Sequence, residues 1–326
     1  MRPHSGAASA AGVASASTGR PAGTLRRAAA WPLRRALRAI KPNAGLTALS
    51  MNPLVAALVA GTSGPVVAKM ADGTPIAVDL DDYHGRILWL TGSNDYKVSR
   101  TVNALLSPGD VFLDIGANHG TVGFAARHAV GPAGAVHLFE PQPYLCNRVA
   151  DALAASGARN VTLHRAALFD ADGAMILRVP SEHSGRATLL PELIEETDGW
   201  ATVRVATRAA GATVAPLVAG RPFGLKIDVE GAEPPILSAL LPFPNLKFAA
   251  FEGDRNEEWL FDAFSGHGFA IFGMVRSLLR PQVARVRSLS EWGAFHDFVA
   301  VRETANLPAR GSVAAFAQAV REGTSG

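Results

Sequence analysis

The chain has 326 residues, enough for one large or two ordinary domains, and its hydrophobic content of 48% allows a sizeable core. Its single cysteine, Cys146, excludes an internal disulfide framework and a zinc site built on a cysteine cluster, and it fits the reducing cytoplasm. Residues 1–50 hold eight basic residues and no acidic one, so the rest of the chain is mildly acidic despite the net charge of +3. Binding of nucleic acid by that acidic remainder is therefore not expected.

The N-terminal segment, residues 1–50, begins with a stretch rich in alanine, serine, glycine and proline. Such a stretch buries too little apolar surface to offset chain entropy, so we expect the segment to be largely disordered. Residues 25–41 differ, because apolar residues and arginines recur there at the spacing of a basic amphipathic helix. That helix either stays solvated or lies on an anionic membrane surface. No signal peptide or transmembrane helix is expected, and Met51 offers an alternative start.

Residues 51–106 are predicted to form an extension ahead of the main domain. Two short apolar runs, 66–70 and 75–80, flank Asp72-Gly73 in the manner of a β-hairpin, and a helical stretch follows at 96–106. The extension is therefore expected to combine a small hairpin with helix.

From residue 107 to residue 303, strand patterns and helix patterns alternate. This alternation predicts an α/β domain with a mainly parallel sheet and helices on both faces, followed by a C-terminal tail at 304–326. The predicted helices cover residues 121–130, 144–156 and 257–265. The predicted strands, with an irregular loop at 181–200, cover residues 111–115, 135–139, 161–166, 173–179, 202–207, 223–229, 246–252, 269–274 and 295–302.

Carboxylates recur at the ends of the predicted strands. In an open α/β sheet the ligand site lies at the carboxyl ends of the strands, so these side chains are expected to share one site. They are Asp114, Glu140, Asp228, Glu230 and Glu252.

The turn after the first predicted strand of the domain has the features of a nucleoside site. Gly116 and Gly120 let the backbone approach a ligand closely, and Glu140, 24 residues after Gly116, suits a carboxylate that accepts hydrogen bonds from two ribose hydroxyls. An NAD site would carry glycine at the middle position of G-x-G-x-x-G, where this chain has Asn118. Asp114 before the turn would repel a pyrophosphate and attract a cationic group, which favours S-adenosylmethionine over NAD.

Four blocks of the sequence resemble the FkbM-type methyltransferases, and the resemblance covers about residues 72–302. It implies S-adenosylmethionine as cofactor and the class I Rossmann-like fold with seven strands. The blocks are Leu113-Asp114-Ile115-Gly116-Ala117-Asn118-His119-Gly120, Phe139-Glu140-Pro141-Gln142-Pro143, Asn160-Val161-Thr162-Leu163 with Ala166-Ala167-Leu168, and Leu225-Lys226-Ile227-Asp228-Val229-Glu230-Gly231-Ala232-Glu233.

The resemblance also assigns roles in cofactor binding. Asp114, Gly116, Asn118 and Gly120 are expected to surround the methionine part, and Glu140 to hold the ribose. Residues 165–167 carry no acid for the adenine amine, so adenine is expected to lie mainly against apolar atoms.

Two positions depart from the family pattern. His119 replaces a small or hydrophobic residue, and a turn histidine is more often exposed to water than in contact with the acceptor. Pro234-Pro235 is expected to delay the start of the following helix, because proline suits only the first turn.

The methyl acceptor is expected to meet the cofactor at Asp228, Glu230 and Glu233. A carboxylate that takes the proton of a hydroxyl would assist the transfer, and Asp228 is the first candidate because it ends the strand. The same carboxylates, completed by Glu252, could instead hold a divalent ion. Glu233 has the alternative role of a helix cap, and Lys226 is expected to face the neighbouring layer as an ion-pair partner.

The resemblance therefore predicts O-methylation of a hydroxyl on a sugar or on a glycosylated or polyketide-like metabolite. The acceptor would be a small molecule or a glycan, and the enzyme would be cytoplasmic, with peripheral membrane contact through residues 25–41 as a further expectation. Two other hypotheses stay open, an NAD-dependent oxidoreductase and a nucleoside-binding protein without catalysis. The loop around His183 could act as a lid or lie passively on the surface.

Overall fold

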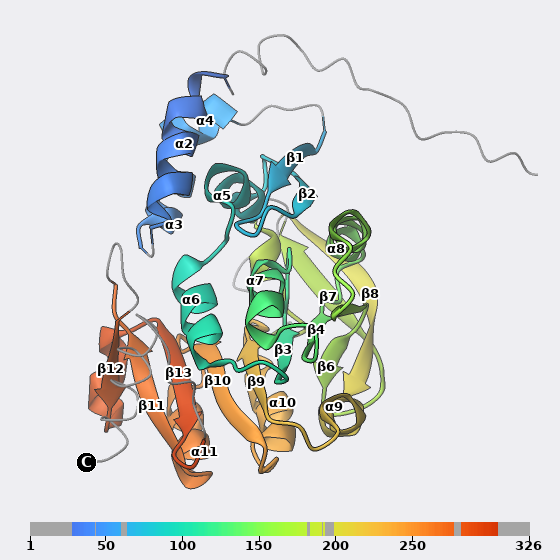
Figure 1. Cartoon of the computed structure of the whole chain (residues 1–326), viewed down its shortest axis with the longest axis vertical. Helices are drawn as coiled ribbons and strands as arrows, with labels where there is room; N and C mark the ends of the chain where they lie inside the picture. The colour runs from blue at the N-terminus through green and yellow to red at the C-terminus, as the bar shows by residue number, and fades with distance from the viewer. Residues whose placement is uncertain are drawn as a thin grey trace, which may run out of the picture.

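The structure is a computed structural model that describes residues 28–42, 44–59, 64–180, 183–190, 192, 199–276 and 282–305. An eight-stranded sheet lies at its centre, in the order β12-β11-β13-β10-β9-β3-β4-β5 (Figure 1). In chain order these strands are β3 (Val111–Ile115), β4 (Ala135–Phe139), β5 (Val161–His164), β9 (Phe223–Ile227), β10 (Leu246–Glu252), β11 (Phe269–Met274), β12 (Val283–Val286) and β13 (Asp297–Arg302).

The sheet is mainly parallel, as predicted. The five strands from β5 to β10 run parallel to one another, and β13 is inserted antiparallel between β10 and β11. These seven strands have the mainly parallel arrangement that the class I fold predicts. The eighth strand, β12, is an antiparallel edge strand that the sequence patterns did not predict.

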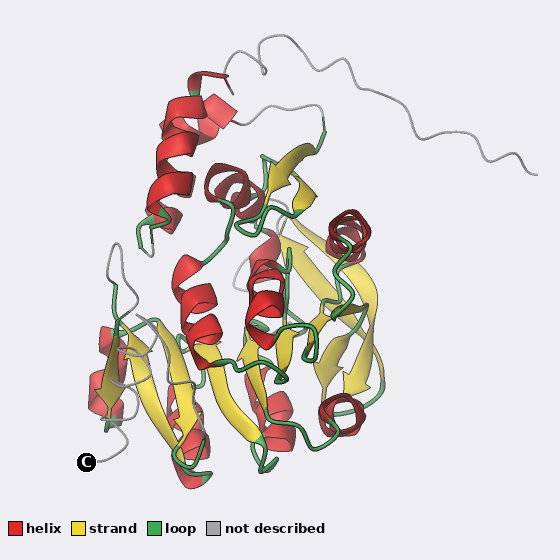
Figure 2. Ribbon diagram, in the orientation of Figure 1, coloured by secondary structure: helices red, strands yellow, loops and turns green. Residues whose placement is uncertain are grey.

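Helices cover both faces of the sheet (Figure 2). Side chains alternate along each strand, so Phe112 packs into one core cluster and Leu113 into the other. The first cluster contains side chains of α6 (Tyr96–Leu105), α7 (Thr121–Val130) and α8 (Pro143–Ser156). The second contains side chains of α9 (Ala210–Val218), α10 (Glu233–Leu240) and α11 (Glu257–Gly266).

A separate three-stranded sheet lies beside the parallel strands. It consists of β6 (Ala167–Phe169), β8 (Trp200–Ala209) and β7 (Gly173–Pro180), in that order, with β7 and β8 antiparallel. The strand predicted at 161–166 therefore ends at His164, and the chain then crosses into the second sheet. The strands predicted at 173–179 and 202–207 belong to this second sheet and add nothing to the central one.

The N-terminal extension forms a cap over one end of the domain (Figure 1). It consists of α2 (Trp31–Ile40), α3 (Leu46–Met51), α4 (Pro53–Val59), the predicted hairpin of β1 (Val66–Lys69) and β2 (Pro75–Val78), and α5 (Tyr83–Thr91).

Helix α2 packs on α5 and is not a free tail. Leu33 and Leu37 lie against the core, Arg34 Nε donates to the carbonyl oxygen of Trp89 at 2.9 Å, and Arg38 donates to that of Lys69 at 2.8 Å. The amphipathic helix predicted within residues 25–41 thus forms at 31–40, but it packs on the extension and does not stay solvated, and two of its arginines donate to backbone carbonyls there. Residues 1–27 lie outside the described part of the chain. None of the described helices has the length and apolar character needed to cross a bilayer.

The double proline does not delay helix α10. The helix begins at Glu233, and Pro234 and Pro235 occupy its first turn. Backbone N–H groups in a first turn have no partner within the helix, so their loss costs nothing there. The expected delay is therefore wrong.

Candidate active site

A cavity of about 1170 Å³ opens at the carboxyl ends of the parallel strands. Six of the eight predicted site residues line it, namely Gly116, Asn118, Glu140, Asp228, Glu230 and Glu252. Gly116, Asn118 and Glu140 line one half of the cavity, which we call the cofactor half. Asp228, Glu230 and Glu252 line the other half, which we call the acceptor half.

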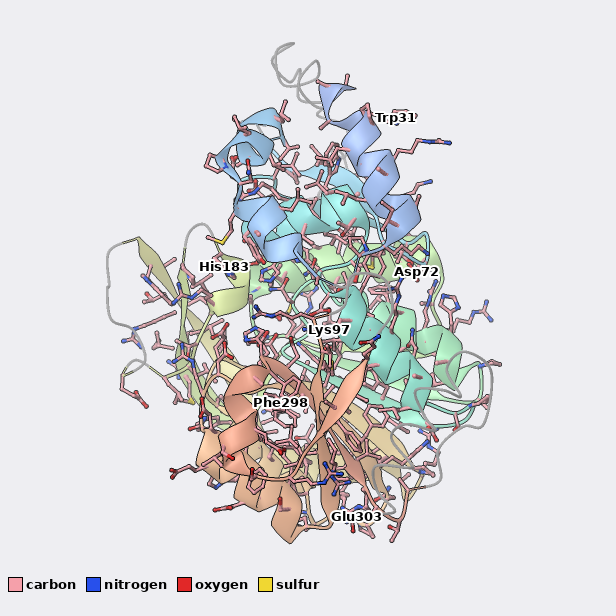
Figure 3. The ribbon with its side chains drawn as sticks, turned by 90° about the vertical axis from the view of Figure 1, so that its left-hand side faces the viewer. Trp31, Asp72, Lys97, His183, Phe298 and Glu303 are labelled. Atoms are coloured by element: carbon pink, nitrogen blue, oxygen red, sulfur yellow. The ribbon has the colours of Figure 1, made fainter. Side chains whose placement is uncertain are left out.

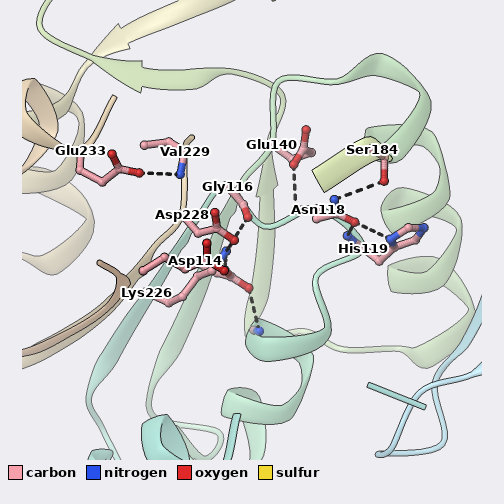
Figure 4. A network of polar contacts seen from close by, with 12 residues as sticks. Asp114, Gly116, Asn118, His119, Glu140, Ser184, Lys226, Asp228, Val229 and Glu233 are labelled. Atoms are coloured by element: carbon pink, nitrogen blue, oxygen red, sulfur yellow. Dashed lines mark hydrogen bonds and ion pairs between the residues drawn. The ribbon is translucent and has the colours of Figure 1, made fainter. Parts of the chain in front are cut away.

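Glu140 is fixed at the centre of the cofactor half. One carboxylate oxygen accepts from the Asn118 backbone N–H and the other from that of Gln142, both at 2.8 Å (Figure 4). The side chain is buried, and this burial raises the pKa of Glu140 to about 7. Each oxygen retains a second lone pair, so the carboxylate can still accept two hydrogen bonds from a diol.

The turn before α7 owes its shape to residues behind the cavity wall. Asp114 is fully buried, and one of its oxygens accepts from the Gly123 backbone N–H at 2.9 Å, which ties β3 to the first turn of α7. Gly120 is the residue before that helix and has a φ of 73°, a conformation that favours glycine. Neither residue lines the cavity. The structure thus places both as residues that shape the turn, whereas Asn118, with a φ of 51°, lines the cavity itself.

Lys226 connects the two halves of the cavity. Its Nζ donates to the carbonyl oxygen of Gly116 at 2.6 Å and lies 3.3 Å from Asp228 Oδ2 and 3.7 Å from Asp114 Oδ1 (Figure 4). Burial alone would lower the pKa of Lys226, but the two neighbouring carboxylates raise it. The prediction that Lys226 faces the neighbouring layer is wrong, because its ion pairs form inside the site.

The acceptor half is crowded with carboxylates. Burial, followed by the charge of Asp228, raises the pKa of Glu230 to about 7. The charge of Asp228, followed by burial, raises the pKa of Glu252 well above its usual value. Glu233 is different, because its carboxylate accepts from the backbone N–H groups of Val229 and Gly231 at 3.1 and 3.3 Å and so fixes the turn before α10.

The extension contributes a wall that sequence patterns did not reveal. The His183 ring stacks on Tyr83 of α5, with 4.4 Å between the ring centroids, and the next residue, Ser184, donates its backbone N–H to Asp82 at 2.7 Å. Gly185 lies so close to His84 that a Cβ atom there would stand 1.9 Å from the imidazole. The short 3₁₀ helix η1 (Ser184–Arg186) is therefore held between the extension and the turn before α7, which we call the cofactor turn.

Two contacts of η1 on the domain side complete this cover. Gln142 donates to the carbonyl oxygen of Ser184 at 2.8 Å, and the Asn118 amide lies 3.4 Å from the Ser184 hydroxyl (Figure 4). The described part of the loop around His183 therefore lies against the cofactor half, whereas residues 181–182, 191 and 193–198 lie outside the described residues, and the choice between a lid and a passive loop stays open. His119 is 2% exposed and burial lowers its pKa to about 4, so the expectation of a water-exposed histidine is wrong.

The far end of the acceptor half contains side chains that the sequence reading missed. Asp254 follows β10, His296 precedes β13 and Asp297 begins it, and Lys97 of α6 (labelled in Figure 3) contacts Asp297. The sequence reading considered only residues at strand ends. The first residues of an antiparallel strand lie at the edge of the sheet where the parallel strands end. In the class I fold the last strand is antiparallel, and this position could have identified His296 and Asp297 as residues of the site.

Apolar side chains line the rest of the cofactor half. Those of Ile115, Phe139, Leu168, Leu177 and Leu189 come from both sheets and from the loop after η1. They form a surface suited to the flat face of an aromatic ring. No acidic residue lies at 165–167.

Two methyltransferases are among the solved structures to which this chain is similar. A methyltransferase FkbM from Methylobacillus flagellatus KT is 13% identical, covers 83% of this chain with a TM-score of 0.38, and is itself covered over 59% of its length. A precorrin-6y C5,15-methyltransferase from Geobacter metallireducens GS-15 is 17% identical, with 63% of this chain and 87% of that chain covered and a TM-score of 0.35. No curated protein matches the chain.

The family assignment rests on the sequence of the domain itself. The family described as the methyltransferase FkbM domain matches residues 114–279, just over half of the chain. The match begins at Asp114, in the cofactor turn, and includes Glu140, Asp228, Glu230 and Glu252. The chain therefore belongs to the FkbM methyltransferase domain family.

Proposed function

We propose that the protein transfers a methyl group from S-adenosylmethionine to a hydroxyl oxygen of a sugar or of a glycosylated or polyketide-like small molecule. The observation that carries this proposal is the division of one cavity into two chemically different halves. Glu140 and an apolar surface lie in one half, and carboxylates that can take a proton lie in the other, among them Asp228, which is paired with Lys226.

The residues of the cofactor half fit this methyl donor. Glu140 keeps two free lone pairs for the ribose hydroxyls, and the apolar side chains suit adenine. Asn118 and the backbone at Gly116 line the region where the methionine part would bind, and Asp228 offers negative charge toward the sulfonium. When bound, S-adenosylmethionine supplies an activated methyl group.

The acceptor half supplies the proton chemistry. A hydroxyl is a weak nucleophile, and removal of its proton during transfer accelerates the reaction, typically by about 10²–10⁴-fold. We assign this role to Asp228, which is paired with Lys226 beside the cofactor turn. Glu230 and Glu252 lie around it, and their raised pKa values provide sites that can receive the proton.

The charge of the acceptor half also restricts the acceptor. Eight carboxylates line the whole cavity against five lysine and arginine side chains. An acceptor that carries phosphate or carboxylate near the reacting hydroxyl would be repelled. A neutral polyol fits this environment best, which is the reason for proposing a sugar hydroxyl.

Calorimetry separates this function from its alternatives. We expect S-adenosylmethionine and S-adenosylhomocysteine to bind and NAD not to bind. Binding of NAD alone would contradict the proposal and favour an oxidoreductase. The acceptor is sought by incubating the protein with methyl-labelled cofactor and neutral glycoside or polyketide fractions. Cofactor binding without transfer to any fraction that contains hydroxyl acceptors would favour a nucleoside-binding protein without catalysis.

A further inference from the structure

We propose that Glu252, His296 and Asp297 bind a divalent metal ion in the acceptor half of the cavity. The proposal concerns a site next to the one assigned to Asp228, and it deepens the proposed function without depending on the identity of the acceptor. One ligand atom from each of the three side chains lies within 4.8 Å of the other two.

The fold brings the three residues together by strand pairing. Glu252 is the last residue of β10 and lies directly opposite Asp297, the first residue of the antiparallel strand β13. The Gly253 backbone N–H donates to the carbonyl oxygen of His296 at 2.8 Å, which holds the ends of the two strands together. The site therefore lies on a rigid corner of the central sheet.

The orientation of His296 is the observation that points to a cation. Its Nδ1 forms a hydrogen bond of 2.6 Å with Asp254 Oδ1, so in the neutral ring Nδ1 carries the proton and Nε2 has a lone pair. Nε2 faces Glu252 Oε1 at 3.8 Å. In the neutral ring, two acceptors face each other here at a distance too long for a hydrogen bond, whereas a protonated ring would direct an N–H toward Glu252 and leave no lone pair for a metal. A carboxylate that fixes the other nitrogen of a histidine is the usual support of a metal-binding imidazole.

The surrounding charges favour a cation at this position. The charges of Asp228, Asp297 and Glu230 raise the pKa of Glu252, and that of Lys226 lowers it. The ion pair between Lys97 and Asp297 is formed by the Oδ2 atom of the carboxylate. A divalent ion would relieve this repulsion more completely than either lysine.

The ligand set determines which ions fit. An imidazole with two carboxylates suits Mn²⁺, Zn²⁺ and related ions better than Ca²⁺. Ligand atoms that share one such ion at about 2.1 Å lie roughly 3 Å apart, whereas those of the three side chains lie within 4.8 Å of one another, so the side chains must move closer to bind it. The side chains of Glu252 and His296 are 44% and 38% exposed and have room to do so.

A bound ion would act on the acceptor. Three protein ligands leave coordination positions open toward the cavity, where an acceptor hydroxyl can replace water. A hydroxyl on a divalent ion loses its proton more readily, and this proton can pass to the neighbouring carboxylates. The ion would thus orient the nucleophile, and Asp228 could then be a weaker base and still take the proton of the hydroxyl.

The test uses the full chain without a histidine tag, after treatment with EDTA and dialysis. Mn²⁺ is titrated in by calorimetry and by electron paramagnetic resonance of the free ion, for the wild type, His296→Ala, Glu252→Gln and the control His128→Ala. The His128 side chain is 62% exposed and does not line the cavity. We expect one Mn²⁺ per chain, at least about tenfold weaker binding in the first two variants, and no change in the control.

S-adenosylhomocysteine is titrated into the same samples. If it binds while Mn²⁺ does not, or if Mn²⁺ binding is equal in all variants, the metal site is wrong and His296 with Asp254 becomes a candidate base that acts without metal. If Mn²⁺ binds at the expected residues but S-adenosylhomocysteine does not, the proposed function fails and the metal site stands.

Discussion

The two halves of the cavity differ in how far their polar groups are already satisfied. In the cofactor half, both oxygens of Glu140 and the carbonyl oxygen of Ser184 hold hydrogen bonds with fixed partners. In the acceptor half, the charge of Asp228 raises the pKa of Glu252 well above its usual value. The first half is preorganised for one ligand, and the second gains stability only when a proton or cation arrives. We therefore expect substitutions in the two halves to affect different measurements.

Asp228→Asn is expected to have the largest effect and to test this division directly. The variant removes the proposed proton acceptor and keeps its size, so turnover should fall by about 10²–10⁴-fold. The affinity for S-adenosylhomocysteine should change little, because this ligand has no sulfonium charge for Asp228 to attract and its other proposed contacts lie in the cofactor half. Turnover is measured with labelled methyl groups and affinity by calorimetry. Turnover that survives would show that Asp228 is not the base, and Glu230→Gln would then be the next variant to measure.

Glu140→Gln is the matching change in the cofactor half. Hydrogen bonds to a charged group contribute about 1.5–3 kcal/mol, so the affinity for S-adenosylhomocysteine should fall by roughly 10–100-fold. The amide has the size of the carboxylate and can still accept from Asn118 on one side. The melting temperature measured beside the affinity separates lost binding from lost folding. Unchanged affinity would contradict the ribose assignment.

The pH dependence of cofactor affinity is expected to be smaller. The pKa of Glu140 is raised to about 7 by burial, and hydroxyl groups donate to the ionised form. Ligand binding therefore favours loss of the proton, so affinity should be full above pH 7 and fall as the pH drops below 7, by at most about tenfold per unit. Calorimetry between pH 5.5 and 8.5 measures this, and the dependence should disappear in Glu140→Gln.

The smallest effect on either half is expected at helix α2. Trp31 is 55% exposed beside Arg35, so contact of this helix with anionic lipid stays a prediction. Trp31→Ala should reduce cosedimentation with vesicles that contain phosphatidylserine and leave cofactor affinity unchanged. Tyr144→Ala, at a residue that is 45% exposed on α8, is the control. Equal vesicle binding by both variants would exclude the helix as the contact.

The sequence predicted the cofactor half far better than the acceptor half. Strand β3 and helix α7 have the predicted bounds, because a buried strand, a glycine turn and a helix are all encoded within 20 consecutive residues. Glu140 follows from the next strand in the same way. These features depend on local pattern and on the order of parallel strands, both of which can be read along the chain.

The acceptor half depends on contacts between distant segments, which local patterns do not encode. His296 reaches Glu252 only because β13 is inserted antiparallel beside β10. The cover of the cofactor half depends on such a contact as well, because Tyr83 and His183 meet across 100 residues and neither lies in a pattern with chemical meaning of its own. Strand β12 is a short edge strand, and its four residues carry too weak a signal to distinguish it from a loop.

The contact between Gly185 and His84 means that the extension and the domain are not interchangeable parts. A side chain at 185 would occupy the space of the His84 imidazole, so the two positions are sterically complementary. A chimera that takes its extension from another family member would close over the cofactor only if the residue at position 84 leaves matching space. The extension and the cover of the active site therefore depend on each other sterically, although some 100 residues separate them in the chain.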